Sequence, residues 1–304
     1  MTASATPDLP AEGIFAIDGV ECRQTPFFLN SPHSGDFFPS AFLARSQLPL
    51  ATLRRASDLF VDDLLAPAPE ALGIPLMRAL FPRSFLDLNR EPFELDPRLI
   101  AGPLPVDANT RSLRVAGGLG TVPRVIGDQI EIYAGKISLE EALGRIEHIY
   151  IPYHMRLHRE LAARHAQHGR VVLVDVHSMP SQSFPRPTRP MPDIVLGDRF
   201  GASCAQPLVD EAERLARQLG FRVERNQPYA GGYITEHYGR PMLGWHALQI
   251  EINRALYMDE TSLTPHAGFA ALSDALIALL GKLYAFEAFE IRNSPLQFSQ
   301  KAAE

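Results

Sequence analysis

Residues able to bind a metal ion and to move protons recur in separate segments of the sequence. His33 follows a short apolar run, His177 ends a long one, and Glu251 lies within a third. Imidazole nitrogen and carboxylate oxygen suit Zn²⁺, which in catalytic sites takes three protein ligands and keeps one position open for water. His33 and His177 are the natural pair of ligands for such a site.

Three aspartates are candidates for the third ligand. Asp58 lies at the start of an expected helix, and Asp36 is three residues after His33. Asp175 is two residues before His177, and we place its carboxylate on the other side of the strand, where it would orient a ligand instead of binding the ion. Asp58 could equally be an ordinary helix cap, and His33 an ordinary turn residue.

Glu251 and Arg90 each have a structural and a functional interpretation. Glu251 stands between Ile250 and Ile252 in an apolar run, and a carboxylate is costly to bury without a partner. Glu251 therefore either forms a structural salt bridge or acts in catalysis, as general base and acid toward a metal-activated water. Arg90, after Asn89, could pair with neighbouring acids or hold a substrate carboxylate.

Other polar clusters carry less weight. The glycines at 117–120 and 231–232 lack the strand-loop-helix spacing of a phosphate loop, so we interpret them as mobile loops over the site. Histidines recur along residues 148–168 at near-helical spacing, interleaved with Arg and Glu. This pattern predicts a solvated helix face.

The elements that must position these residues follow an α/β pattern. Short apolar runs alternate with amphipathic stretches, which predicts a three-layer fold with a mixed, mostly parallel sheet flanked by helices. Strands are expected at 26–30, 75–80, 84–88, 170–176, 221–225 and 247–252, and helices at 58–72, 138–168 with a kink at Pro152, 207–219 and 267–286. In such sheets ligands bind outside the carboxyl ends of the strands, where most of the candidate residues fall.

Composition bounds the class of protein. The chain has 304 residues, 46% hydrophobic and 21% charged, and a formal net charge of −6, which excludes general disorder and argues against a nucleic-acid partner. Two distant cysteines, Cys22 and Cys204, exclude a disulfide framework and a cysteine zinc ribbon. Without a basic-apolar leader or an apolar run near ~18 residues, we expect a cytoplasmic protein with no membrane contact.

We expect a flexible segment at 1–12, a single catalytic domain over 13–290 and a C-terminal tail at 291–304.

Six segments together resemble one known family. They are 31–35 (SPHSG), 57–64 (SDLFVDDL), 86–92 (LDLNREP), 174–178 (VDVHS), 231–239 (GGYITEHYG) and 249–260 (QIEINRALYMDE). Over residues 25–262 the combination resembles the N-formylglutamate amidohydrolase (formylglutamate deformylase) family, which is related to zinc hydrolases of the carboxypeptidase and aspartoacylase type. The resemblance implies a zinc-carboxypeptidase-like (phosphorylase/hydrolase-like) α/β fold, with about eight strands in a mixed sheet and one zinc at the strand ends.

The resemblance also implies roles for individual residues. It assigns zinc to His33, Asp58 and His177, catalysis to Glu251, and the substrate carboxylate to Asn89 and Arg90, with Arg186 as a further candidate. Carboxypeptidases have their acidic ligand three residues after the first histidine, where this chain has Asp36. That position is not reliably acidic in the deformylase family, which favours Asp58.

The function expected is a zinc-dependent amidohydrolase that cleaves N-formyl-L-glutamate, or a similar acidic N-acyl amino acid, to formate and the free amino acid. Histidine catabolism is the pathway that the resemblance implies. Two alternatives stay open: a carboxypeptidase-like hydrolase acting on peptides or cell-wall fragments, and a non-catalytic metabolite-binding protein. The sequence leaves assembly into a homo-oligomer open as well.

Overall fold

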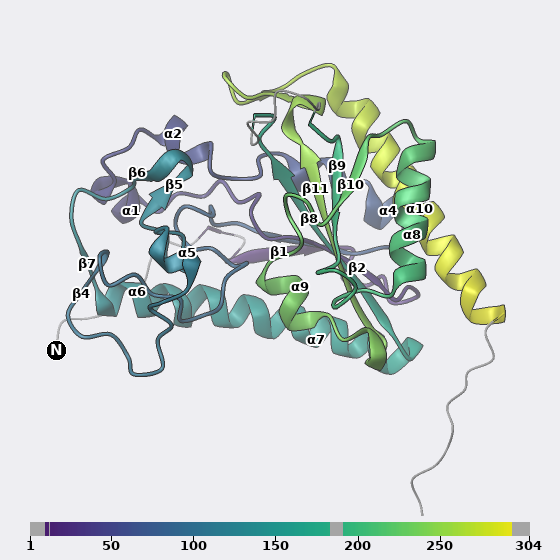
Figure 1. Ribbon diagram of the computed structural model, residues 1–304, viewed down its shortest axis with the longest axis horizontal. Coiled ribbons are helices and arrows are strands. Elements are labelled where there is room, and N and C mark those ends of the chain that lie inside the picture. The colour runs from purple at the N-terminus through teal and green to yellow at the C-terminus, as the bar shows by residue number, and fades with distance from the viewer. Residues whose placement is uncertain (1–9, 12, 183–190, 294–304) are drawn as a thin grey trace, which may run out of the picture.

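A seven-stranded mixed sheet forms the centre of the protein. The computed structural model describes residues 10–11, 13–182 and 191–293. Across the sheet the strands lie in the order β1-β3-β2-β8-β11-β9-β10 (Figure 1). They are β1 (Phe15–Asp18), β2 (Phe27–Ser31), β3 (Leu76–Ala79), β8 (Val171–Met179), β9 (Ile194–Gly197), β10 (Val223–Arg225) and β11 (Trp245–Asn253).

Four of the six strand pairings are parallel, which confirms the mixed, mostly parallel sheet. β3, β2, β8 and β11 run parallel to one another, and β10 runs parallel to β9. β1 and β9 run antiparallel to their neighbours β3 and β11. The carboxyl ends of β2, β3, β8 and β11 therefore meet at one edge.

β8 is the central strand and is buried along its whole length. Its β-branched run was predicted to end at 176, but the strand continues to Met179 and contains His177. Val172, Val174 and Val176 face one hydrophobic core. Because alternate residues of a strand share a face, His177 lies on the opposite face, with the second core.

Helices cover both faces of the sheet, which confirms the three layers. α3 (Val61–Leu65), α4 (Ala68–Leu72), α8 (Gln206–Gln218) and α10 (Gly268–Asn293) pack over one face. α7 (Ile151–His168) and α9 (Tyr233–Tyr238) pack over the other. α6 (Leu139–Arg145) lies beyond the sheet and contacts the short strands at residues 100–101 and 137–138.

Short elements make up the rest of the described chain. The helices are α1 (Ser40–Arg45), α2 (Leu50–Arg54) and α5 (Leu113–Ala116), with 3₁₀ turns at Gly127–Gln129, Pro241–Leu243 and Arg254–Leu256. Two-residue strands pair as β4 (Ile100–Ala101) with β7 (Ile137–Ser138), β5 (Val125–Ile126) with β6 (Ile130–Glu131), and β12 (Met258–Asp259) with β13 (Thr264–Pro265). Cys22 and Cys204 are free thiols.

Two predicted elements were wrong. The helix expected at 58–72 is two short helices, α3 and α4, because Phe60 adopts a left-handed conformation (φ 65°) and Pro67 separates them. The strand expected at 84–88 is a buried loop whose first residues turn back on the carbonyl of Pro82. The run of apolar residues in this segment reflects the burial of the loop in the second core.

The long helix begins as predicted but changes register before Pro152. Ser138 caps α6 by accepting a hydrogen bond from the backbone N–H of Glu141 at 3.1 Å. A π-helical turn, Ile146–Tyr150, then joins α6 to α7. Pro152 has no N–H for the carbonyl four residues earlier, and a turn with i to i+5 bonds skips the missing donor.

The prediction of a solvated histidine face on this helix was wrong in part. His148 and His158 are exposed, but His154 Nε2 donates a hydrogen bond to the carbonyl of Leu88 at 2.9 Å, and its Nδ1 lies 3.0 Å from the hydroxyl of Tyr238. Burial lowers the pKa of His154 to about 4. Its ring is thus part of the packing between α7 and α9.

α10 is, among the described helices, the one long and apolar enough to cross a membrane by length and composition, over Gly268–Glu287. Its leucines at 276, 279 and 283 are buried in the first core, and the helix packs against α3, α4 and α8. Of this apolar stretch, 33% is buried within the protein.

Ser138→Ala is expected to lower the free energy of unfolding by about 1 kcal/mol, because the first N–H groups of α6 lose a side-chain acceptor. Urea denaturation monitored by circular dichroism measures the difference. Ser138→Asp retains an acceptor at the same place and should recover most of the loss. Equal stability of the alanine and aspartate variants would contradict the cap.

Candidate metal centre

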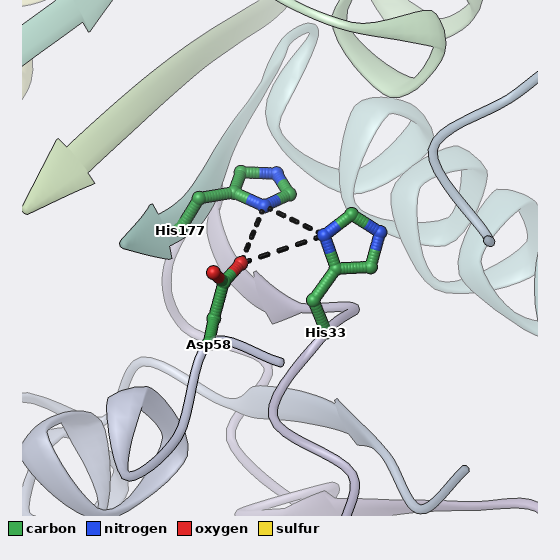
Figure 2. Close-up of side chains that lie close together, drawn as sticks. All are labelled: His33, Asp58 and His177. Carbon is green, nitrogen blue, oxygen red and sulfur yellow. Dashed lines mark hydrogen bonds and ion pairs between the residues drawn. The ribbon is translucent and has the colours of Figure 1, made fainter. Parts of the chain in front are cut away.

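Three donor atoms from distant segments face one another at the strand ends. His33 lies two residues after β2, Asp58 precedes α3, and His177 is in β8. The two Nδ1 atoms are 3.2 Å apart, and Asp58 Oδ2 lies 3.1 Å from that of His177 and 3.4 Å from that of His33 (Figure 2). All three side chains are buried.

The triangle fits a tetrahedral metal ion. With metal–ligand bonds of roughly 2.0–2.1 Å, tetrahedral donors lie about 3.3 Å apart. The outer ring nitrogens are occupied: His33 Nε2 lies 2.8 Å from Asp87 Oδ1, and His177 Nε2 lies 2.9 Å from Asp175 Oδ2. A proton on each outer nitrogen leaves a lone pair on each Nδ1, pointing into the triangle.

Electrostatics favour a positive charge at the same point. Burial opposes the charged form of His177, yet Asp175 and Asp58 raise its pKa well above the usual value. Burial likewise opposes ionisation of Asp58, but hydrogen bonds from His177 and His33 hold its pKa well below the usual range. The cluster is therefore arranged to hold a cation.

Asp58 is anchored through its other oxygen. Oδ1 accepts hydrogen bonds from Ser178 Oγ at 3.0 Å and from Arg254 Nη2 at 3.2 Å. Its backbone N–H donates to the carbonyl of His33 at 2.9 Å, which ties the two segments together. Oδ2 is thereby turned toward the histidines.

Of the other two aspartates, one lies outside the cluster and one behind it. Asp36 is part-exposed and pairs with Arg54 at 2.8 Å. The placement of Asp175 on the other side of the strand from His177 was wrong, because residues two apart in a strand share a face. Its carboxylate contacts the outer nitrogen of His177, as an orienting residue would.

Glu251 lies beside His177 on the neighbouring strand. The two residues are paired in the register of β8 and β11, so their side chains share a face. Glu251 Oε1 accepts a hydrogen bond from Gln249 Nε2 at 2.9 Å, and Gln249 Oε1 accepts one from the N–H of Gly232 at 2.9 Å. Burial, with the nearby charge of Asp58 adding to it, raises the pKa of Glu251 to about 7.

Asn89 reaches the cluster, whereas the guanidinium of Arg90 is largely engaged in the fold. Asn89 Nδ2 lies 3.3 Å from His177 Nε2, and its Oδ1 accepts from the N–H of Ile234 at 2.8 Å. Arg90 Nε donates to the carbonyl of Leu119 at 2.9 Å and Nη1 to that of Asn89 at 2.8 Å. Arg186 lies outside the described residues, as do most of 1–12 and 291–304.

Two residues of the site were missed from the sequence. Arg83 Nε binds Asp87 Oδ2 at 2.9 Å, its side chain is 32% exposed, and neighbouring carboxylates, first that of Asp87, raise its pKa against the effect of burial. Gln249 holds Glu251. Gln249 could have been found as the polar residue two positions before Glu251 on the same strand face, and Arg83 was hidden by the strand expected over 84–88.

The glycines at 231–232 were interpreted as a mobile loop over the site. Gly232 lies against the site, and a Cβ at this position would lie 2.3 Å from Asn89 Nδ2. The close approach requires a residue without a side chain. Together with the hydrogen bond to Gln249, this contact connects the loop to both Asn89 and Glu251.

Known proteins are similar to this chain in sequence. A model of the N-formylglutamate amidohydrolase family matches residues 25–258. The N-formylglutamate deformylase of Pseudomonas aeruginosa is 30% identical over 263 residues, 86% of this chain and 91% of that protein. The N-formylglutamate deformylase of Pseudomonas putida is 33% identical over 193 residues, 62% of this chain and 66% of that protein.

Solved structures are similar to this chain in fold. The crystal structure of N-formylglutamate amidohydrolase from Ralstonia eutropha JMP134 has a TM-score of 0.86 and 33% identity, over 91% of this chain and 99% of that one. A structure from Agrobacterium tumefaciens, at 20% identity and a TM-score of 0.66, shares the fold over 92% of this chain and 98% of that one. These matches define a hydrolase, and the structure gives it an α/β fold with a candidate metal centre. The chain belongs to the N-formylglutamate amidohydrolase family.

The donor geometry predicts one zinc ion per chain. His177→Ala removes one of three donors, and elemental analysis should then find only a small fraction of the zinc bound by the unchanged protein. His148→Ala, at an exposed histidine outside the cluster, should leave the zinc content unchanged. Full zinc content in His177→Ala would remove this histidine from the ligands.

Proposed function

We propose that the protein is a zinc-dependent amidohydrolase that converts N-formyl-L-glutamate, or a similar acidic N-acyl amino acid, to formate and the free amino acid. The observation that carries the proposal is the triangle of His33, Asp58 and His177 with Glu251 beside it. Support for the substrate comes from the relatives, which are named for deformylation of N-formylglutamate.

His33, Asp58 and His177 would hold the ion through the three inward donor atoms. When bound there, zinc supplies Lewis-acid polarisation of the scissile carbonyl and of the attacking water. Asp87 and Asp175 keep the outer ring nitrogens protonated, so the inward nitrogens stay free to bind.

Glu251 is the proposed proton carrier. A carboxylate with a pKa of about 7 is half ionised near neutrality, so it can both accept and return a proton. It would take a proton from water as the oxygen attacks the formyl carbon, and deliver a proton to the amide nitrogen as the C–N bond breaks. Water and the amide become formate and the amino group, with no covalent intermediate.

The anionic ends of the substrate require cationic or amide partners. Arg83, part-exposed beside Asp87, is the proposed partner for a substrate carboxylate or for the polarised carbonyl oxygen. Asn89 would contribute its amide. Arg90 and Arg186 stay candidates from the sequence, the first as support for the loop that contains Asn89.

We also propose that residues 13–290 form a single catalytic domain in a cytoplasmic enzyme. Both hydrophobic cores share the one sheet, which supports a single unit. A place in histidine catabolism remains a prediction.

Glu251→Gln tests the mechanism. The change keeps the three metal donors, so zinc content should be unchanged, while kcat for formate release should fall roughly 10²–10⁴-fold because the proton carrier is lost. Glu224→Gln, at an exposed glutamate in β10, should retain normal kcat. A near-normal rate for Glu251→Gln would refute its role. No formate from N-formylglutamate with zinc-loaded protein would refute the proposed function, and cleavage of peptides instead would favour the peptidase alternative.

Gly232→Ala tests the contact with Asn89. The new Cβ must displace the Asn89 side chain or the loop, and a misplacement of about 1 Å at a site can cost on the order of 10²-fold in rate. We expect a comparable fall in kcat/KM for formate release with zinc content retained. Gly135→Ala, where a Cβ meets open space, is the matched control. Equal kcat/KM in the two variants would show that the contact is unimportant.

A further inference from the structure

A line of buried hydrogen bonds continues behind His177, away from the metal donors. Asp175 Oδ2 lies 2.9 Å from His177 Nε2, and Asp175 Oδ1 accepts from Asn30 Nδ2 at 2.8 Å. Asn30 Oδ1 in turn accepts from the hydroxyl of Tyr153 at 2.5 Å. Asn30, Tyr153 and Asp175 are each 0% exposed.

Three elements contribute to this line. Tyr153 comes from α7, Asn30 from β2, and Asp175 with His177 from β8. Asn30 and Asp175 are paired in the register of β2 and β8, so their side chains lie side by side on the face that α7 covers. The line therefore crosses from the helical layer into the sheet and ends at a candidate metal ligand.

The direction of each hydrogen bond is fixed by chemistry. An ionised Asp175 is acceptor-only, so Asn30 must present its amide nitrogen and the outer nitrogen of His177 must carry a proton. With the amide nitrogen so used, the amide oxygen faces the hydroxyl of Tyr153, which can donate to it. Reversing the Asn30 amide would set its oxygen against the carboxylate, which is repulsive.

The two histidines are held in different ways. Asp87, behind His33, is bound by Arg83 and by the backbone N–H of Asn89. Asp175, behind His177, receives the neutral amide of Asn30. Removing that amide would leave a carboxylate oxygen in the interior without its donor, which is costly, and the carboxylate would turn to regain one.

We propose that Asn30 and Tyr153 are positioning residues for the metal ion, acting through Asp175 on His177. They hold the Asp175 carboxylate so that His177 keeps its proton on Nε2 and presents Nδ1 to the ion. The inference rests on the proposed zinc site, and assigns part of its affinity to residues three and four contacts away from the ion.

Asn30→Leu and Tyr153→Phe test the proposal. Loss of groups that orient metal ligands typically weakens binding 10–100-fold. We expect a zinc Kd, measured by competition with a chelator, at least 10-fold higher for Asn30→Leu and several-fold higher for Tyr153→Phe. Long-range ¹H–¹⁵N spectra of the zinc-loaded protein should show His177 bound through Nδ1 with its proton on Nε2, and a fraction of His177 not bound through Nδ1 in Asn30→Leu.

Tyr150→Phe is the matched control. Tyr150 is also buried but donates to the carbonyl of Arg90, outside the line, so its Kd should stay within twofold of the unchanged protein. Tyr153→Phe removes a single oxygen and keeps the ring, so it remains informative if Asn30→Leu folds poorly. Unchanged zinc affinity and an unchanged His177 spectrum in Tyr153→Phe and in folded Asn30→Leu would overturn the inference.

These experiments distinguish a failure of this inference from a failure of the proposed function. Protein that binds zinc tightly but releases no formate from N-formylglutamate would overturn the function, while the ratio of zinc affinities still decides the roles of Asn30 and Tyr153. Normal formate release with an affinity ratio of one would overturn these roles alone.

Discussion

Three electron-pair donors pointed at one another, with no hydrocarbon between them, are the constraint on which this structure depends. Two imidazole nitrogens and a carboxylate oxygen lie 3.1–3.4 Å apart in the interior. Facing lone pairs repel unless a cation or a proton lies among them, and each side chain is also held from behind. The carboxylates behind the rings, and the hydroxyl and guanidinium on Asp58, are that support.

The parallel centre of the sheet brings these groups together from distant parts of the chain. β2, β8 and β11 are adjacent and parallel, so the segments after position 31, around 177 and around 251 reach one edge. Asp58 is outside the sheet and is connected to it by Arg254, which follows β11 and also donates to the carbonyls of Arg55 and Ser57. One arginine thus ties the last strand of the site to the loop of its acidic ligand.

Sequence patterns predicted the part of the site that depends on strand ends. Apolar β-branched runs indicate buried strands, and polar residues at their ends or within them are costly enough to be informative, which brought out His33, His177 and Glu251. The residues that support the metal ligands from behind were not predicted, because only contacts between segments distant in sequence reveal their role. Asn30 and Tyr153 look like ordinary members of a strand and a helix, and Arg83 lies in a buried loop whose apolar residues imitate a strand. His154 looked solvated because the cover provided by α9 is distant in sequence.

The π-helical turn at Ile146–Tyr150 has a consequence for how this stretch tolerates changes in length. Such a turn contains one residue more than an α-helical path would, and each residue advances a helix by about 100°. Deleting any single amino acid between 146 and 150 should therefore leave regular α-helix and keep Tyr153 on its side of the cylinder, whereas deleting one residue between 151 and 152 should rotate Tyr153 by about 100°. A relative that is one residue shorter at the π turn is therefore expected to retain the contact from α7 to β2, and one that is shorter just after the turn is expected to lose it.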